Sequence, residues 1–308
     1  MSEFVLTDEN YYSREADKHY MSCSQFQRFE KCEAETMAYL WDLWDVEEKP
    51  PALLQGQYFH SALESPEAFE KFCEEHFQDI YKTKTTKARG EEIVGKYAAY
   101  ELLDKMLESV KADPVWSSVL GWEGENEKFM TGTIGGVEWR MKMDKYAVGR
   151  LIVDYKTSAN IRELFYNPET REKESFIEHY GYLMRAAVYG EIERQNAGED
   201  EFPGFLILAV SKQDPPDKDA FMLNDDTRWH IELDKVRDKV RRYHDIKLGI
   251  EKPKRCGVCD YCRSTKKVKK IRSYLDLSPQ YANSPDNEEE YDDYNGRSLL
   301  EDTAEQKG

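Results

Sequence analysis

The stretch at residues 140–158, which reads RMKMDKYAVGRLIVDYKTS, constrains the fold more than any other part of the chain. Two β-rich segments, residues 137–142 and 151–155, flank a short polar turn that contains Gly149. Segments of this kind on either side of such a turn are typical of a β-hairpin. The sequence therefore predicts two strands that pair with each other here.

Three charged side chains make this hairpin a candidate site. Asp144 is expected where the first strand ends, and Asp154 and Lys156 where the second strand ends. Because side chains alternate between the faces of a strand, Asp154 and Lys156 should share one face. Two carboxylates that converge in a partly buried site repel each other unless a divalent cation lies between them. The set predicts a metal-dependent phosphodiesterase centre; alternatively, Asp154 and Lys156 are ordinary solvent-facing residues.

The segment MKMDKYAVGRLIVDYKT resembles the core of the PD-(D/E)XK nucleases. Met143-Asp144 takes the place of the family's Pro-Asp, and Asp154-Tyr155-Lys156 is its D-x-K. More narrowly, residues 22–267 resemble the phage and prophage RecE-type (exonuclease VIII-like) exonucleases. They resemble the RecB and AddB nuclease domains and the CRISPR adaptation nucleases more distantly. The resemblance implies a mixed α/β (α+β) fold with a restriction-endonuclease-like core, in which helices flank a central mixed β-sheet.

Three parts are expected along the chain. Residues 1–21 form an N-terminal extension, residues 22–272 the nuclease domain with a cysteine clasp at its end, and residues 273–308 an acidic tail. The tail contains ten acids and two bases and has no hydrophobic period, which is typical of disorder. Its role is either solubility or occupation of the DNA channel as an autoinhibitor.

Hydrophobic periodicity predicts the remaining elements. Helices are expected at residues 22–44, 53–64, 66–77, 91–110, 174–195 and 228–248. Further strands are expected at residues 125–134, 205–210 and 220–223, and the continuous apolar run at 205–210 is typical of a buried central strand. Residues 81–90 are expected to form a basic, threonine-rich loop.

Four further residues receive roles from the resemblance. The Gly56-x-x-x-His60 arrangement resembles the family's histidine motif, in which the imidazole is a metal ligand; otherwise His60 is a core residue. Glu127 is either an additional acid of the metal site or an exposed strand glutamate. Arg185-Ala-Ala-Val-Tyr189 replaces the family's Gln-x-x-x-Tyr, which assigns a phosphate contact to Arg185 and a site role to Tyr189, with core packing as the alternative.

The net charge of −17 is unusual for a protein that binds DNA, because phosphate contacts by Lys and Arg supply most non-specific affinity. A cluster of bases in the loop at residues 81–90 is nevertheless suited to phosphate contact: Lys82, Lys84, Lys87 and Arg89. A second basic cluster lies between residues 263 and 272. Either cluster could instead be solvated surface charge.

Cys256, Cys259 and Cys262 are closely spaced, which indicates metal binding in a reducing compartment. Cys32 could supply a fourth thiolate. A single distant cysteine plus a C-terminal triplet resembles the structural iron–sulfur clasp of AddB and the CRISPR adaptation nucleases, which implies a [4Fe-4S] cluster. Zinc fits four thiolates equally well, and a metal-free cysteine knuckle is the third alternative.

A cytoplasmic location is expected for two reasons. No apolar run reaches the ~20 residues of a membrane helix, and residues 1–10 lack the basic and apolar segments of a secretion signal. The resemblance implies that the protein acts in a bacterial host cell and is encoded by a phage or prophage.

The predicted function is a Mg²⁺-dependent (or Mn²⁺-dependent) deoxyribonuclease that degrades DNA from its ends. Asp144 and Asp154 hold the metal with His60 and Glu127, and Lys156 orients the attacking water. The resemblance implies 5′→3′ digestion of duplex DNA, a RecT-like annealing partner for the 3′ single strand, and a homo-oligomer. The alternatives are an end-trimming or single-strand nuclease of the CRISPR-adaptation type and a non-catalytic DNA-binding protein.

Overall fold

The computed structural model describes residues 4–44, 51–86, 90–168, 170–268, 271, 273 and 274. The chain divides into two compact units. The cysteine unit comprises Met1–Val46, Gly135–Glu138 and Arg237–Gly308, and the sheet unit comprises Glu47–Ile134 and Trp139–Val236. Most of the predicted acidic tail lies outside the described residues.

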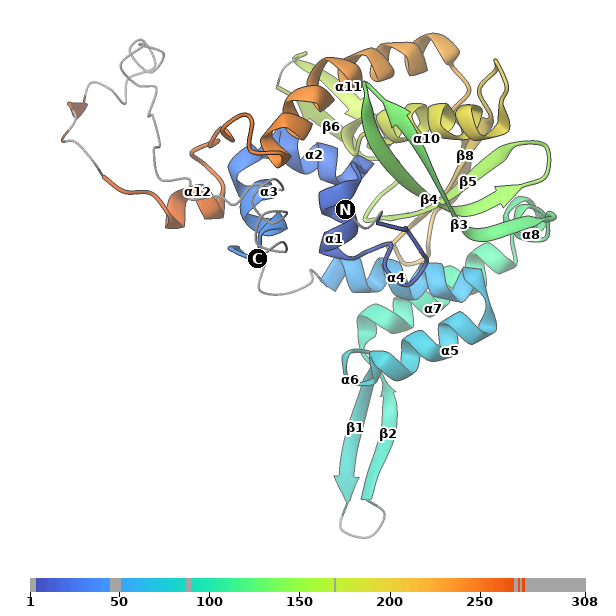
Figure 1. The fold of residues 1–308 in the computed structure, drawn as a ribbon. Helices are drawn as coiled ribbons and strands as arrows, with labels where there is room; N and C mark the ends of the chain where they lie inside the picture. The colour runs from blue at the N-terminus through green and yellow to red at the C-terminus, as the bar shows by residue number, and fades with distance from the viewer. Residues whose placement is uncertain are drawn as a thin grey trace. The chain divides into compact units, whose positions relative to one another are not determined.

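A five-stranded mixed sheet organises the sheet unit (Figure 1). Its strands, in spatial order, are β3 (Gly124–Ile134), β4 (Val137–Ala147), β5 (Leu151–Ser158), β8 (Gly204–Ser211) and β9 (Lys218–Met222). Strand β5 pairs antiparallel with β4 and parallel with β8, whereas β8 pairs antiparallel with β9. This arrangement confirms the predicted mixed sheet, the buried strand at residues 205–210 and the edge strand at 220–223.

Helices cover both faces of this sheet. On one face, Val153 and Tyr155 of β5 and apolar residues of β8 pack against α4 (Pro51–Glu64), α7 (Ala98–Lys111) and α8 (Pro114–Leu120). On the other face lies α10 (Tyr182–Ala197), which contacts β3 and β8. Burial on both faces explains why β5 and β8 are apolar runs without alternation.

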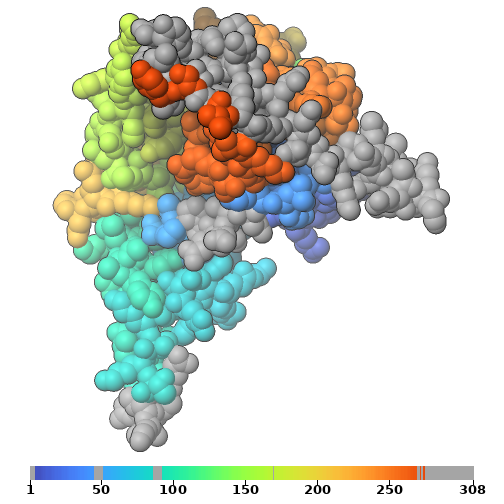
Figure 2. Space-filling view, turned by 90° about the vertical axis from the view of Figure 1, so that its left-hand side faces the viewer, coloured from blue at the N-terminus to red at the C-terminus, as the bar shows by residue number. Residues whose placement is uncertain are grey.

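Short elements complete the sheet unit. They are α5 (Pro66–Glu75), α6 (Phe77–Ile80), the pair β1 (Tyr81–Thr86) and β2 (Gly90–Lys96), the pair β6 (Leu164–Asn167) and β7 (Glu172–Ser175), and α9 (Phe176–His179). Figure 2 shows the hairpin of β1 and β2 in cyan, extending away from the helices that precede and follow it.

The described helices of the cysteine unit lie at both ends of the sequence. They are α1 (Arg14–His19), α2 (Cys23–Lys31), α3 (Glu33–Leu40), α12 (Asp260–Ser264) and the second half of α11 (Asp226–Lys247). A buried lysine joins α11 to the first residues of the chain. Lys247 Nζ donates to the carbonyls of Asp17 and Tyr20 at 2.7 and 3.1 Å, and to Gln25 Oε1 at 3.1 Å.

Three predicted elements are wrong. The helix expected at residues 22–44 is two helices, because Cys32 adopts an extended backbone and caps both α2 and α3. The helix expected at 174–195 is interrupted at Gly181, whose φ of 70° lies in the left-handed region that favours glycine. The loop at 81–90 and the start of the next helix form the β1–β2 hairpin, in which alternating β-branched threonines favour a strand.

No helix in the described part of the chain is both long enough and apolar enough to cross a lipid bilayer.

The close approach of α10 and α11 generates a prediction. A Cβ added at Gly190 would overlap the ring of Trp229, a fully buried residue, whereas a Cβ added at Gly56 of α4 meets nothing within 4 Å. Gly190→Ala should therefore lower the free energy of unfolding by about 1–3 kcal/mol in a urea titration. Gly56→Ala is the matched control and should raise it by up to about 1 kcal/mol, since alanine is the better helix former. Equal effects of the two substitutions would contradict this packing.

Candidate active site

The predicted acids lie where β4 and β5 separate. The antiparallel register of the two strands runs from Ala147/Leu151 to Lys145/Val153. Beyond this last pair, the backbone N–H of Tyr155 on β5 donates to Asp144 Oδ2 of β4 at 2.6 Å. A carboxylate thus replaces the backbone carbonyl as the acceptor for β5, which fixes Asp144 against the strand that carries the other candidate residues.

The expected position of the acids at strand ends is wrong. Strand β4 continues past Asp144 to Ala147, and β5 continues past Lys156 to Ser158. Strand β5 continues to Ser158 because it stays paired with β8 as far as Ser211. The acids therefore lie within the sheet.

Asp154 and Lys156 share one face of β5, as predicted. Lys156 Nζ lies 2.5 Å from Asp154 Oδ2, and Arg185 Nη1 of α10 lies 3.7 Å from Asp154 Oδ1. Asp154 is only 3% exposed, which excludes the solvent-facing alternative for this residue. Among the described residues, none forms a hydrogen bond of good geometry with its Oδ2 despite the nearby ammonium. A buried carboxylate oxygen with an unused acceptor position fits a hard divalent cation.

His60 of α4 pairs with Asp144. Its Nδ1 lies 3.2 Å from Asp144 Oδ1, and its ring lies edge-on to Tyr155 at 6.1 Å. Burial opposes ionisation of both groups, but their mutual attraction outweighs it: the pKa of Asp144 is lowered and that of His60 is raised. The Lys156 charge and the Tyr155 amide also lower the pKa of Asp144. The contact with His60 therefore favours the ionised form of Asp144.

Glu127 of β3 is half-buried beside this pair. Its Oε2 lies 3.2 Å from Lys142 Nζ, and its backbone φ of 51° is uncommon for a residue other than glycine. Burial and the charge of Asp144 raise the pKa of Glu127 despite Lys142. Glu127 is therefore within the electrostatic range of the site and is not a simple exposed glutamate.

Sequence reasoning missed Lys142 and Tyr182. Lys142 precedes Asp144 by two residues and so lies on the same face of β4, a signal that strand alternation could have provided. Lys156 Nζ lies 5.5 Å from the centre of the Tyr182 ring, a cation–π distance. Tyr182 is the first residue of α10 because the helix begins after Gly181. The spacing of apolar residues in the sequence did not indicate this start.

Tyr189 lies in the core, and the described lysines of the first basic cluster lie on the β1–β2 hairpin. The Tyr189 hydroxyl donates to the Lys142 carbonyl at 3.2 Å, and its ring packs on Phe205 at 6.2 Å, which supports the core-packing alternative. Lys82 and Lys84 are exposed on β1 of the hairpin. Lys87, Arg89 and part of the second basic cluster lie outside the described residues.

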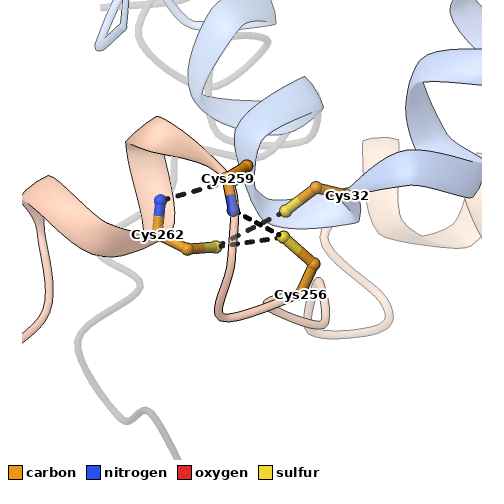
Figure 3. Close-up of side chains that lie close together, drawn as sticks. All are labelled: Cys32, Cys256, Cys259 and Cys262. Carbon is orange, nitrogen blue, oxygen red and sulfur yellow. Dashed lines mark hydrogen bonds between the residues drawn. The ribbon is translucent and has the colours of Figure 1, made fainter.

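The structure brings the four predicted cysteine ligands together in the cysteine unit (Figure 3). The sulfurs of Cys32, Cys256, Cys259 and Cys262 all lie within 4.8 Å of one another. Burial opposes a thiolate, but the amides of Val258 and Cys259 and neighbouring thiols lower the pKa of Cys256 to about 7. This is the one set of three or more potential metal ligands gathered so closely in the described part of the chain.

The acids of the sheet unit do not form a set of that kind. Asp144 is paired with His60, and Asp154 is paired with Lys156. Coordination of one ion by His60, Asp144 and Asp154 remains a prediction, supported by the oxygen and nitrogen donors that the site offers.

Comparisons with known proteins agree with this description. The model of the family "PDDEXK-like domain of unknown function (DUF3799)" matches residues 22–265. The crystal structure of a protein from Eubacterium rectale, named "Putative exonuclease", is 31% identical. That match covers 90% of this chain and 99% of the other, with a TM-score of 0.78. A second structure, SSO0001, is 10% identical over 71% of this chain and 85% of the other. Its TM-score of 0.26 is too low to indicate a shared fold. No curated protein matches the chain.

Cation binding at the acids can be measured without any reaction. Mg²⁺ should raise the melting temperature, because a ligand bound only by the folded state stabilises it by about 1.4 kcal/mol at a tenfold excess over Kd. Asp154→Asn should abolish most of this shift, which is measured by differential scanning fluorimetry. Glu163→Gln removes an exposed carboxylate from the loop after β5 and should leave the shift unchanged. An undiminished shift in Asp154→Asn would place the cation elsewhere.

Proposed function

The chain belongs to the PDDEXK-like domain family, and on this premise we propose that it is a divalent-metal-dependent nuclease that degrades DNA from its ends. The observation that carries the proposal is the buried Asp154 carboxylate, which faces Lys156 on the same strand and lies beside the Asp144–His60 pair. A structural role alone does not account for so many ionisable groups in the interior of a sheet. The similarity to the Eubacterium rectale protein supports action at DNA ends.

Each residue has a defined task in this proposal. Asp144, Asp154 and His60 hold the cation, and Glu127 adds a carboxylate at its edge. A bound Mg²⁺ or Mn²⁺ would lower the pKa of a water and offset the charge that develops on the phosphate. Lys156 donates to the Tyr155 carbonyl at 3.0 Å and would position the attacking water with a remaining N–H. The ring of Tyr182 and the Asp154 carboxylate restrict where this ammonium can lie.

Arg185 extends the site toward the substrate. Its guanidinium lies 3.7 Å from Asp154 Oδ1, too far for a strong bidentate pair, and 5.8 Å from the centre of the Tyr189 ring. A guanidinium placed beside the buried acid is suited to binding the phosphate next to the bond that is cleaved. We therefore assign a phosphate contact to Arg185, which stands at the position of the family's glutamine.

The biological setting forms part of the proposal. Digestion from 5′ ends of duplex DNA would leave a 3′ single strand, which an annealing protein of the RecT type could bind before it re-pairs. A homo-oligomer would keep several chains on one DNA end. The cysteine arrangement favours the second candidate, an end-trimming or single-strand nuclease of the CRISPR-adaptation type.

Purified protein with Mg²⁺ should degrade linear duplex DNA and spare closed circular DNA of the same sequence. Asp154→Asn and Lys156→Met should each lower the rate by at least ~10²-fold, because they remove a metal ligand and the donor that orients the water. Release of labelled nucleotides measures the rate. Glu163→Gln should retain full activity.

A duplex with one blocked 5′ end distinguishes the two candidates. Digestion from 5′ ends predicts that the blocked strand survives while the other strand is degraded. Trimming of both strands irrespective of the block would favour the second candidate. Wild-type rates in Asp154→Asn and Lys156→Met would refute a catalytic role for this site, whereas DNA binding without any degradation by the wild-type chain would favour a non-catalytic DNA-binding protein.

The exposed lysines of β1 generate a separate prediction. If the β1–β2 hairpin contacts phosphates, Lys82→Ala combined with Lys84→Ala should weaken duplex binding and reduce the slope of log K against log salt by about 2. Fluorescence anisotropy in Ca²⁺ measures binding without cleavage. Lys71→Ala is the control, since Lys71 is an exposed base of the same unit on α5. An unchanged slope would show that the hairpin does not contact the backbone of DNA.

A further inference from the structure

We infer that Cys32, Cys256, Cys259 and Cys262 form a closed tetrahedral zinc site that binds one ion per chain. This site lies in the cysteine unit and is separate from the proposed nuclease centre. The inference replaces the [4Fe-4S] cluster that the resemblance implied, and it rests on the spacing of the sulfurs, their hydrogen bonds and the packing around them.

The sulfur spacing matches a single shared ion. A tetrahedral ion with metal–sulfur bonds of about 2.3 Å sets neighbouring sulfurs ~3.8 Å apart. Cys32 Sγ lies 3.6 Å from Cys262 Sγ, and Cys256 Sγ lies 3.9 Å from Cys262 Sγ. These two distances bracket the value expected around zinc.

The same spacing disfavours a cluster. Each thiolate of a [4Fe-4S] cluster binds a different iron, so the four thiolate sulfurs lie outside the cube formed by the irons and sulfides. Their separations must then exceed those around one shared ion. All four sulfurs here lie within 4.8 Å of one another, which leaves no room for a cube between them.

Backbone N–H groups hold three of the sulfurs in place. The amide of Glu35 points at Cys32 Sγ at 3.5 Å, that of Cys259 at Cys256 Sγ at 3.3 Å, and that of Cys262 at Cys259 Sγ at 3.4 Å. Two of these contacts appear as dashed lines in Figure 3. Hydrogen bonds of this kind stabilise thiolates and orient metal ligands, and they partly offset the net charge of −2 of a zinc ion with four thiolates.

The donor set fits zinc in a structural role. Four protein ligands complete a tetrahedron and leave no position for water or substrate, which is the pattern of structural zinc. Zinc also binds nitrogen and sulfur ligands more tightly than Fe²⁺ does. No residue proposed for the nuclease reaction belongs to the set, so the site acts on the fold.

The apolar cluster around the sulfurs is small. The buried members of this apolar cluster are Cys32, Ala34 and Cys262, and the partly buried members are Cys256, Cys259 and Tyr261. Most of the cluster thus consists of the thiols themselves. Because Cys32 and Cys262 are 230 residues apart in sequence, an ion that binds both closes a long loop and stabilises the folded chain.

The metal content of the full chain tests the inference directly. Protein purified without oxygen and without chelators should contain one zinc per chain, no acid-labile sulfide and no visible absorption band. Mass spectrometry of the metals and a sulfide assay provide these values. Four irons with four sulfides per chain would overturn the inference, and so would a single iron without sulfide.

Cobalt substitution tests the geometry without a variant. Co²⁺ exchanged into the wild-type chain should give the strong visible bands of a tetrahedral ion and the thiolate charge-transfer band in the near ultraviolet. Weak octahedral bands or a missing charge-transfer band would overturn the inference. Removal of the ion by a chelator should increase hydrogen exchange at residues 256–264 while exchange in β5 and β8 stays unchanged.

Substitution then tests the ligand set. Cys259→Ser should lower the retained zinc at least ~10-fold. Cys73→Ser is the matched control, because Cys73 is a free cysteine of α5 outside the cluster, and it should retain one zinc. Full zinc in Cys259→Ser, or equal loss in both variants, would refute the proposed ligands. Since the zinc measurements use no DNA, they can succeed even if the nuclease proposal fails.

Discussion

The sheet unit depends on the contact between the Asp144 carboxylate and the Tyr155 amide. At this point β4 stops pairing with β5 through backbone groups, and a side chain takes over. Past this residue β5 keeps its ladder on one side only, with β8. A carboxylate accepts a stronger hydrogen bond from the backbone N–H than a carbonyl does. The arrangement therefore permits a separation of two central strands without leaving a buried donor unpaired.

That separation has an electrostatic consequence. Ionised groups lie in the interior of the sheet unit, where removal of one partner of a buried ion pair costs about 3–5 kcal/mol. Each acid lies next to a basic side chain: His60 next to Asp144, Lys156 next to Asp154 and Lys142 next to Glu127. Apolar packing on both faces supplies the stability that these groups do not. Gly190 contributes to this packing, since its lack of a side chain lets α10 approach Trp229.

The sequence predicted the part of this architecture that local patterns encode. The apolar runs of β5 and β8 and the turn at Gly149 were sufficient to place the central strands, and D-x-K spacing was sufficient to place Asp154 and Lys156 on one face. The breaks at Cys32 and Gly181 were missed because the apolar period continues across them, although the Cys32 thiol caps the start of α3 and the left-handed Gly181 precedes α10. The β1–β2 hairpin was missed because it is rich in exposed polar residues and so gives no apolar period. Tyr182 reaches the site through tertiary packing, which periodicity does not report, whereas strand alternation could have indicated Lys142.

The two sites of this chain use donors of opposite character, and this difference allows them to select different ions. The sheet unit offers carboxylate oxygens and one imidazole, which suit Mg²⁺ or Mn²⁺, whereas the cysteine unit offers four thiolates, which suit zinc. Thiolates bind Mg²⁺ poorly, so an excess of Mg²⁺ does not displace zinc. At the proposed nuclease centre, Mg²⁺ or Mn²⁺ would have to compete with the side chains that already pair with Asp144 and Asp154. Under the two proposals, one chain can therefore bind zinc through thiolates and Mg²⁺ or Mn²⁺ through carboxylate oxygens.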